Sequence, residues 1–153
     1  MFHANAIALE NPFAVELSFK LQPFDLDSYG FASEFAYLRW LGSLRQEFLQ
    51  QHFDLAQGTC PVLVSTQIEH KQPVRSSEPG LGPLSSVVSG RLWLANLGET
   101  RWTLQSRLES TQGVTVATAV QVGHMINADT LMPVAIPEAL AQRYWDYQWR
   151  QSS

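Results

Sequence analysis

The chain has 153 residues and a net charge of −4, with 16% charged and 45% hydrophobic residues. This length is enough for one domain with a real core, and there is no run of Lys and Arg that could neutralise nucleic-acid phosphates. The one cysteine excludes an internal disulfide framework and fits a reducing compartment. No apolar run approaches the ~18 residues of a membrane span, and the first residues lack the basic region of a signal peptide. We therefore expect a cytoplasmic protein without nucleic-acid or membrane partners.

The first half of the chain predicts one strand and one long helix. After a loose leader over residues 1–12, apolar and polar residues alternate over residues 13–21, which predicts a strand with one buried face. A turn rich in Asp follows over residues 25–30. The strongest helical pattern of the chain begins after Ser33, a good N-cap, and runs to Phe53.

This helix is apolar over most of its circumference, so we expect it to be enclosed by other elements. Residues at spacings of three and four predict its buried face, which Tyr37, Trp40 and Leu49 widen beyond a narrow stripe. The residues at these spacings are Phe35, Leu38, Leu41, Leu44 and Phe48. Gly42 lowers the stability of the helix, and we expect a strand to approach it closely in compensation.

The second half of the chain predicts a meander of strands. A loop rich in Pro and Gly over residues 75–86 separates the first two strands of this half, and Pro137 opens a short helix. The order of one strand, one long helix and further strands with short connections favours an antiparallel sheet in an α+β architecture. The expected strands cover residues 62–71, 87–97, 102–109 and 114–126.

The Asp-rich turn before the long helix allows three interpretations. In a structural one, the carboxylates of Asp25 and Asp27 accept hydrogen bonds from backbone N–H groups of the turn. In the second, they bind a metal ion, although no other carboxylate or His cluster supports such a site. In the third, a carboxylate attacks a bound carbonyl group or activates water, while first-turn N–H groups of the helix polarise the carbonyl oxygen.

The stretch over residues 25–37, DLDSYGFASEFAY, resembles a known signature. It is similar to the Asp-x-Asp-x-x-Gly-x-x-x-x-x-x-Tyr pattern of the 4-hydroxybenzoyl-CoA thioesterase-like branch of the hotdog-fold acyl-CoA thioesterases. The resemblance implies a single hotdog domain over residues 1–153, with a core over about 13–137 and a C-terminal helix over about 137–149. In this fold an antiparallel five-stranded sheet wraps around one long central helix.

The same resemblance implies the catalytic roles. Asp27 stands at the position of the family's catalytic carboxylate, which acts as a nucleophile or as a general base for water. The backbone N–H of Glu34, at the helix start, would polarise the thioester carbonyl. Asp25 would support the turn, and Gly30 would allow the close turn of the backbone.

The resemblance also implies an acyl-CoA substrate and no metal or cofactor. Tyr29, Gly30, Phe31 and Tyr37 would bind the substrate, and the aromatic side chains near the motif favour an aromatic or bulky acyl group, such as a benzoyl or dihydroxynaphthoyl group. Some relatives hold the CoA phosphates with several basic residues before the fourth strand. Here that loop has one Arg, Arg101, so a non-CoA carrier remains an alternative.

Hotdog proteins place their sites at subunit interfaces, so the resemblance implies a homodimer or homotetramer. Two alternatives to an acyl-CoA thioesterase are a non-catalytic acyl-binding hotdog module and a thioesterase that acts on acyl carrier protein. A hotdog dehydratase would require a His paired with a carboxylate near the helix, and no His lies there in the sequence.

Overall fold

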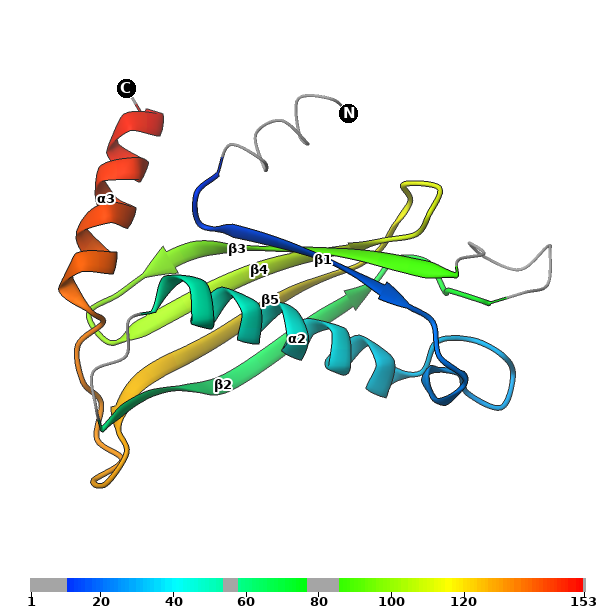
Figure 1. The fold of residues 1–153 in the computed structure, drawn as a ribbon, viewed down its shortest axis with the longest axis horizontal. Helices are drawn as coiled ribbons and strands as arrows, with labels where there is room; N and C mark the ends of the chain where they lie inside the picture. Colours follow the sequence, from blue (N-terminus) through cyan, green and yellow to red (C-terminus); the bar gives the residue numbers. More distant parts are fainter. Residues whose placement is uncertain (1–10, 54–57, 77–85, 153) are drawn as a thin grey trace.

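The computed structural model describes residues 11–53, 58–76 and 86–152. It contains the expected succession of one strand, a long helix, four strands and a short helix (Figure 1). The leader over residues 1–10 and most of the predicted loop over residues 75–86 lie outside the described residues. The elements are β1 (Ala14–Lys20), the 3-10 turn η1 (Pro23–Asp25), α2 (Glu34–His52), β2 (Thr59–His70), β3 (Val87–Leu97), β4 (Arg101–Glu109), β5 (Thr115–Asn127) and α3 (Glu138–Ser152).

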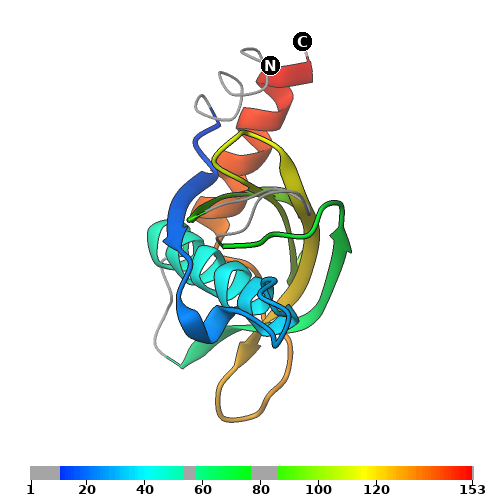
Figure 2. The ribbon, with the colours of Figure 1, turned by 90° about the vertical axis from the view of Figure 1, so that its right-hand side faces the viewer.

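The strands form one antiparallel five-stranded sheet in the order β1-β3-β4-β5-β2. Figure 2 shows that the sheet curves and that α2 lies along its concave face. The antiparallel α+β architecture expected from the sequence is therefore confirmed. None of the helices in the described part of the chain is long and apolar enough to cross a membrane.

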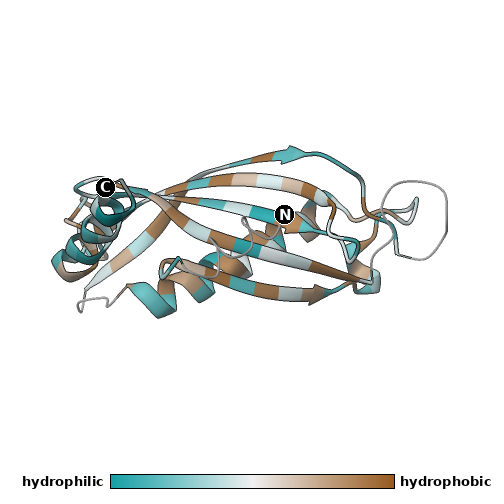
Figure 3. Ribbon diagram, turned by 90° about the horizontal axis from the view of Figure 1, so that it is seen from above, coloured by the Kyte–Doolittle hydropathy of each residue, from teal (hydrophilic) through white to brown (hydrophobic). Residues whose placement is uncertain are grey.

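The core lies between α2 and the concave face of the sheet. Trp40 of α2 and Trp102 of β4 are both fully buried. Hydrophobic and hydrophilic residues alternate along the strands, so one side of each strand faces the core and the other faces outward (Figure 3). A fully buried large apolar side chain contributes roughly 1.5–3 kcal/mol, so this contact is the main source of stability that the fold offers.

The buried face of α2 agrees with the predicted face except at the two residues nearest the helix start. Phe35 and Leu38 are 73% and 48% exposed, so the prediction is wrong for the first turns of the helix. A helix that is apolar nearly all round offers several stripes at spacings of three and four, and the position of the sheet selects one of them. The buried residues are Ala36, Tyr37, Trp40, Leu41, Leu44, Phe48 and Leu49.

The expected close approach of a strand to Gly42 is also wrong. The nearest atom to a Cβ built at Gly42 is Nη2 of Arg45 on the same helix, at 3.9 Å. The close contact between helix and sheet instead involves Gly90 of β3, where an added Cβ would lie 2.7 Å from Cδ1 of Leu44. The small residue that lets α2 approach the sheet therefore belongs to the strand.

Strand β2 begins at Thr59, three residues before the expected start, and it passes through Pro61. Proline cannot donate a hydrogen bond to a neighbouring strand, which confines it to the edges of sheets and to bulges. Because β2 pairs only with β5 among the described strands, it is an edge strand. The edge position explains how residues 59–61, which the sequence pattern leaves outside the strand, are extended.

Replacing Gly123 of β5 by Ala is expected to destabilise the fold. An added Cβ would overlap the indole ring of Trp102 and the carbonyl oxygen of Val62. We expect Gly123→Ala to lower the free energy of unfolding by about 1–3 kcal/mol, as overpacking of a filled core does, in urea titrations followed by fluorescence. Gly98→Ala is the control, because its added Cβ comes no closer than 3.7 Å to another atom. Equal stability of the two variants would contradict this account of the core.

Candidate active site

The turn between η1 and α2 holds the carboxylate of Asp27 by one of its two oxygens. Oδ1 accepts hydrogen bonds from the backbone N–H groups of Tyr29 at 2.8 Å and of Phe31 at 3.0 Å. The turn is closed by a bond of 2.7 Å from Asp27 N–H to the carbonyl oxygen of Phe31, and Gly30 supplies the φ of +84° that the chain requires. No hydrogen bond to Oδ2 of Asp27 is present in the described part of the chain. The carboxylate is thus oriented by one oxygen and offers the other.

The start of α2 offers backbone donors. The hydroxyl of Ser33 caps the helix by accepting a bond of 3.3 Å from Ala36 N–H, which confirms the expected N-cap. Among the described residues, none accepts a hydrogen bond from the backbone N–H of Glu34 or of Phe35. First-turn N–H groups have no partner within their helix, and the helix dipole adds positive potential there. These two donors can therefore bind an oxygen with developing negative charge.

Asp25 has a structural role in the turn. Its side chain is 1% exposed, and its two oxygens accept bonds of 2.7 and 2.8 Å from Nη2 of Arg39. The backbone N–H of Gln22 donates a further bond of 2.8 Å to Asp25. Arg39 therefore neutralises Asp25 and contacts both of its oxygens. Within the described residues there is no group of three or more His, Cys, Asp and Glu side chains that could hold a metal ion.

Arg39 is a residue of this site that the sequence pattern did not predict. In the sequence it belongs to the thin polar edge of the helix, and 14 positions separate it from Asp25. The pairing depends on the fold, because η1 carries Asp25 back alongside the second turn of α2. The sequence offers one signal for this pairing, because Arg39 is a charged residue among the apolar residues in the first half of the helix.

The aromatic residues assigned to the substrate lie in different environments. The ring of Tyr37 is buried and packs edge-on against His70, with ring centroids 4.7 Å apart. Burial raises the pKa of the Tyr37 phenol above its usual value, so the side chain stays neutral. Phe31 is half-buried with the guanidinium of Arg75 over its ring, at 5.5 Å from the centroid. Tyr29 is 83% exposed and touches the site through its backbone N–H only.

Arg75, Arg91 and Arg101 are weak substitutes for the basic residues with which some relatives hold CoA phosphates, and the structure does not gather all three at the turn. Arg75 is buried against Phe31. Arg91 pairs with Glu16 at 2.6 Å, on the convex face of the sheet. Arg101 is exposed at the start of β4. Of these three arginines, Arg75 contacts the turn through the ring of Phe31, and the other two lie elsewhere on the sheet.

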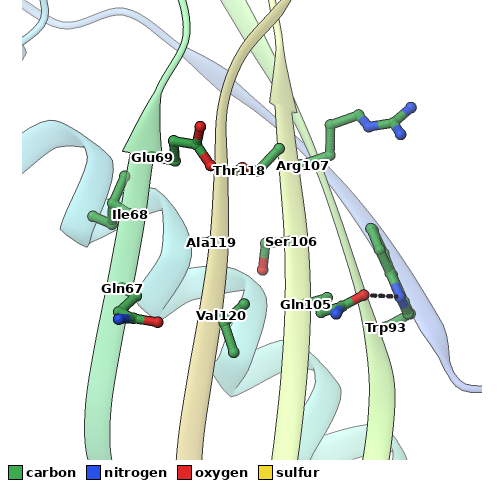
Figure 4. Close-up of a pocket in the computed structure, with 10 residues that line it drawn as sticks. All are labelled: Gln67, Ile68, Glu69, Trp93, Gln105, Ser106, Arg107, Thr118, Ala119 and Val120. Atoms are coloured by element: carbon green, nitrogen blue, oxygen red, sulfur yellow. Dashed lines mark hydrogen bonds between the residues drawn. The ribbon is translucent and has the colours of Figure 1, made fainter.

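A groove on the convex face of the sheet is separate from this turn (Figure 4). Gln105 and Arg107 line it, and on β4 they alternate with side chains that are buried against α2. The indole N–H of Trp93 donates a bond of 3.2 Å to Oε1 of Gln105 within the groove. The sheet thus lies between this groove and the core beneath α2.

Residues 21–144 match the family model of the thioesterase-like superfamily. The match covers most of the 153 residues, so the chain belongs to this superfamily. The enzyme class that the sequence resemblance implied, thioester hydrolysis, is confirmed at the level of the family. A search of curated protein sequences found no significant match.

Solved structures support the hotdog fold. A Staphylococcus aureus protein in complex with CoA is 15% identical, with a TM-score of 0.73 over 88% of this chain and 83% of the other. DHNA-CoA thioesterase from S. aureus is 14% identical, with a TM-score of 0.70 over 91% of each chain. A 1,4-dihydroxy-2-naphthoyl-CoA thioesterase from Synechocystis is 13% identical, with a TM-score of 0.67 over 82% of this chain and 90% of the other. At these identities the similarity establishes the fold.

We expect Asp25→Asn to destabilise the fold, because it leaves the guanidinium of Arg39 beside a neutral amide. A fully buried pair loses about 3–5 kcal/mol when one partner is removed. Since the Arg39 side chain is 40% exposed and solvent screens it, we expect a loss of about 1–3 kcal/mol, measured by urea unfolding. Glu69→Gln is the control, because its pair with Lys71 is exposed on both sides. A loss no larger than that of the control would refute the structural role of Asp25.

Proposed function

We propose that this protein hydrolyses acyl-CoA thioesters at the turn before α2. The observation that carries the proposal is the pairing of an oriented carboxylate with unused backbone donors. Asp27 is fixed through Oδ1 and keeps Oδ2 available, while the N–H of Glu34 stands at the helix start seven residues later. A thioester carbonyl that accepts a hydrogen bond from Glu34 N–H would present its carbon to Asp27.

The reaction requires a general base or nucleophile and a group that stabilises negative charge on the carbonyl oxygen. The turn before α2 can provide both. In the general-base route, Oδ2 of Asp27 takes a proton from water, and the water oxygen attacks the carbonyl carbon. The negative charge on the carbonyl oxygen is stabilised by the N–H of Glu34 and the helix dipole. Collapse of the intermediate breaks the C–S bond, and the CoA thiolate recovers the proton. In the nucleophilic route, Oδ2 attacks the carbonyl carbon, the C–S bond breaks and the CoA thiolate leaves. Water then cleaves the mixed anhydride, which releases the acid, regenerates the Asp27 carboxylate and supplies the proton that the thiolate takes up.

We propose an aromatic or otherwise bulky acyl group. Phe31 is half-buried beside the catalytic turn, and Tyr37 lies buried behind the helix start. Gly30 leaves space at the turn, because nothing lies within 4 Å of a Cβ built there. Two of the solved structures similar to this chain are named as thioesterases of naphthoyl-type CoA esters, which is compatible with this substrate class.

An acyl group on acyl carrier protein is the second candidate. The observation that favours it is the arrangement of the arginines, since Arg75 is buried against Phe31 and Arg91 is paired with Glu16. An acyl carrier protein delivers its thioester on a phosphopantetheine arm, so it does not need a site for the adenosine phosphates. Activity on the same acyl group attached to either carrier distinguishes the two candidates.

We further propose a homodimer formed through the free edge of β2. This strand has 12 residues, and none of the described strands pairs with its outer edge. Exposed backbone groups on a long edge strand favour pairing with another strand. Leu63 and Val64, at the middle of β2, are 42% and 55% exposed. An antiparallel pair of β2 strands would cover them and would bring two catalytic turns to one interface.

Substitution of Asp27 tests the proposed reaction. We expect Asp27→Asn to lower kcat for benzoyl-CoA by ~100-fold or more, because the amide can neither attack nor accept a proton from water. Release of thiol from a panel of acetyl, hexanoyl, benzoyl and naphthoyl thioesters, on CoA and on acyl carrier protein, measures activity and ranks the substrates. The amide oxygen that this substitution introduces can still accept the bonds from the N–H groups of Tyr29 and Phe31, so the turn should keep its shape.

The matched control for this variant is Asp146→Asn, at an exposed position of α3. It should retain full activity. Undiminished cleavage by Asp27→Asn would place the chemistry elsewhere in the molecule. If the wild type cleaves no thioester on either carrier, a non-catalytic acyl-binding role replaces the proposed hydrolysis.

Substitution at the centre of β2 tests the proposed dimer. We expect Val64→Lys to convert the dimer to a monomer, because a charge at the centre of a β2 pair would meet its own symmetry copy. Light scattering after size-exclusion chromatography measures the mass. Val114→Lys is the control, since Val114 is 38% exposed beside the turn that joins β4 and β5. An unchanged dimer mass for Val64→Lys would show that β2 is not the interface.

A further inference from the structure

Two apolar surfaces lie at opposite ends of the free edge of β2. One consists of Leu131 and Met132, which are 68% and 63% exposed. The other consists of Phe35 and Leu38 at the start of α2, which are 73% and 48% exposed. Exposed apolar side chains that gather in patches mark interaction sites. Neither pair is covered by the described part of its own chain.

The first surface belongs to an ordered loop over residues 127–133, between β5 and α3. Oδ1 of Asn127 accepts bonds of 2.9 and 3.0 Å from the backbone N–H groups of Asp129 and Thr130. Leu131 has a φ of 64°, a conformation that branched side chains rarely adopt. The loop therefore holds a leucine in a strained conformation while exposing it to solvent. Such strain persists at positions that serve contacts.

Each surface is tied to one end of β2. The 127–133 loop is joined to the residue before the strand, because Ala128 N–H donates a bond of 2.7 Å to the carbonyl oxygen of Gly58. The start of α2 is joined to the other end. There the ring of Tyr37 packs on His70, and Ala32 N–H donates a bond of 2.8 Å to the segment after β2. Figure 1 shows the orange loop and the blue turn before α2 at these opposite ends.

The proposed dimer brings the two surfaces together. Antiparallel pairing of two identical strands about their midpoint places the beginning of one strand beside the end of the other. Leu63 and Val64 occupy the middle of β2, next to its bulge. The 127–133 loop of one copy would therefore face the start of α2, and the turn of Asp27, in the other copy.

We propose that the 127–133 loop of each copy closes the acyl site of its partner, with Leu131 and Met132 covering Phe35 and Leu38. The inference rests on the proposed function, since the site in question is the one that contains Asp27. The loop supplies an apolar wall for the acyl group and excludes water from the helix start, where hydrogen bonds to the carbonyl oxygen are strengthened by desolvation. The loop is a specificity-determining element contributed in trans.

Cross-linking tests the placement without any need for activity. On a Cys60→Ser background, one chain carries Phe35→Cys and a coexpressed chain carries Met132→Cys. A short bismaleimide should produce a dimer-sized product that requires both chains. Replacing Met132→Cys by Trp149→Cys, at an exposed position of α3, should remove it. Absence of the product from the first pair, or an equal yield from the control pair, would overturn the proposal.

Complementation between two weakened variants tests the function of the loop. The first variant is Asp27→Asn, and the second is the double variant Leu131→Ser, Met132→Ser. In a mixed dimer, one site combines the intact Asp27 of the second chain with the intact loop of the first. Random mixing of equal amounts should therefore restore about one quarter of the wild-type activity toward benzoyl-CoA. If the loop served its own chain, every site in the mixture would be defective and activity would stay at the level of the components.

The double variant should also change specificity. We expect kcat/KM for benzoyl-CoA to fall ~10-fold or more, mainly through KM, because apolar contacts with the acyl group are lost. Acetyl-CoA, which has almost no acyl group to contact, should be affected much less, and Trp149→Ser should leave both substrates unchanged. An equal loss for both substrates would contradict a role in acyl recognition. If wild type hydrolyses nothing, the proposed function fails, and the cross-linking result still decides where the loop lies.

Discussion

The packing of α2 into the concave face of the sheet is the contact on which the other features depend. Trp40 and Trp102 are fully buried in it, and Gly90 and Gly123 leave the space that their neighbours occupy. Burial of these large side chains is the dominant favourable term in folding. Because the helix is fixed along its length, its first turn is also fixed relative to η1. The position of the proposed chemistry is therefore a consequence of the core.

Asp25 and Asp27 are two positions apart in the turn before α2, but their carboxylates have different environments. Asp25 is buried and satisfied by Arg39, whereas Asp27 is exposed and satisfied at one oxygen only. Burial with an ion pair makes a carboxylate structural, since its lone pairs are occupied. Exposure with one free oxygen, near unused N–H groups of a helix start, leaves the second carboxylate able to react. This division supports the family's thioester chemistry at Asp27.

The described part of a single chain exposes apolar side chains and the outer edge of β2 near the proposed site. In the proposed dimer, a second copy would cover the edge of β2 and the exposed side chains of Phe35, Leu38, Leu131 and Met132. Strand pairing would satisfy backbone groups, and apolar contacts at both ends would fix the register of the pair. In this proposal the 127–133 loop contributes to the substrate site of the partner, while pairing of the β2 strands holds the dimer together.

Local patterns in the sequence were sufficient for the order of the elements, the α+β class, the N-cap at Ser33 and the motif that contains Asp27, because periodicity and turn chemistry depend on neighbouring residues. The resemblance of residues 25–37 pointed correctly to the family. The remaining features depend on contacts that form only in the folded chain. The position of the sheet decides which face of α2 is buried and leaves Phe35 exposed. The fold also brings Arg39 to Asp25 and places Pro61 within an edge strand. These features depend on residues far apart in the chain, and a helix that is apolar nearly all round carries no local signal for the side that the sheet will cover.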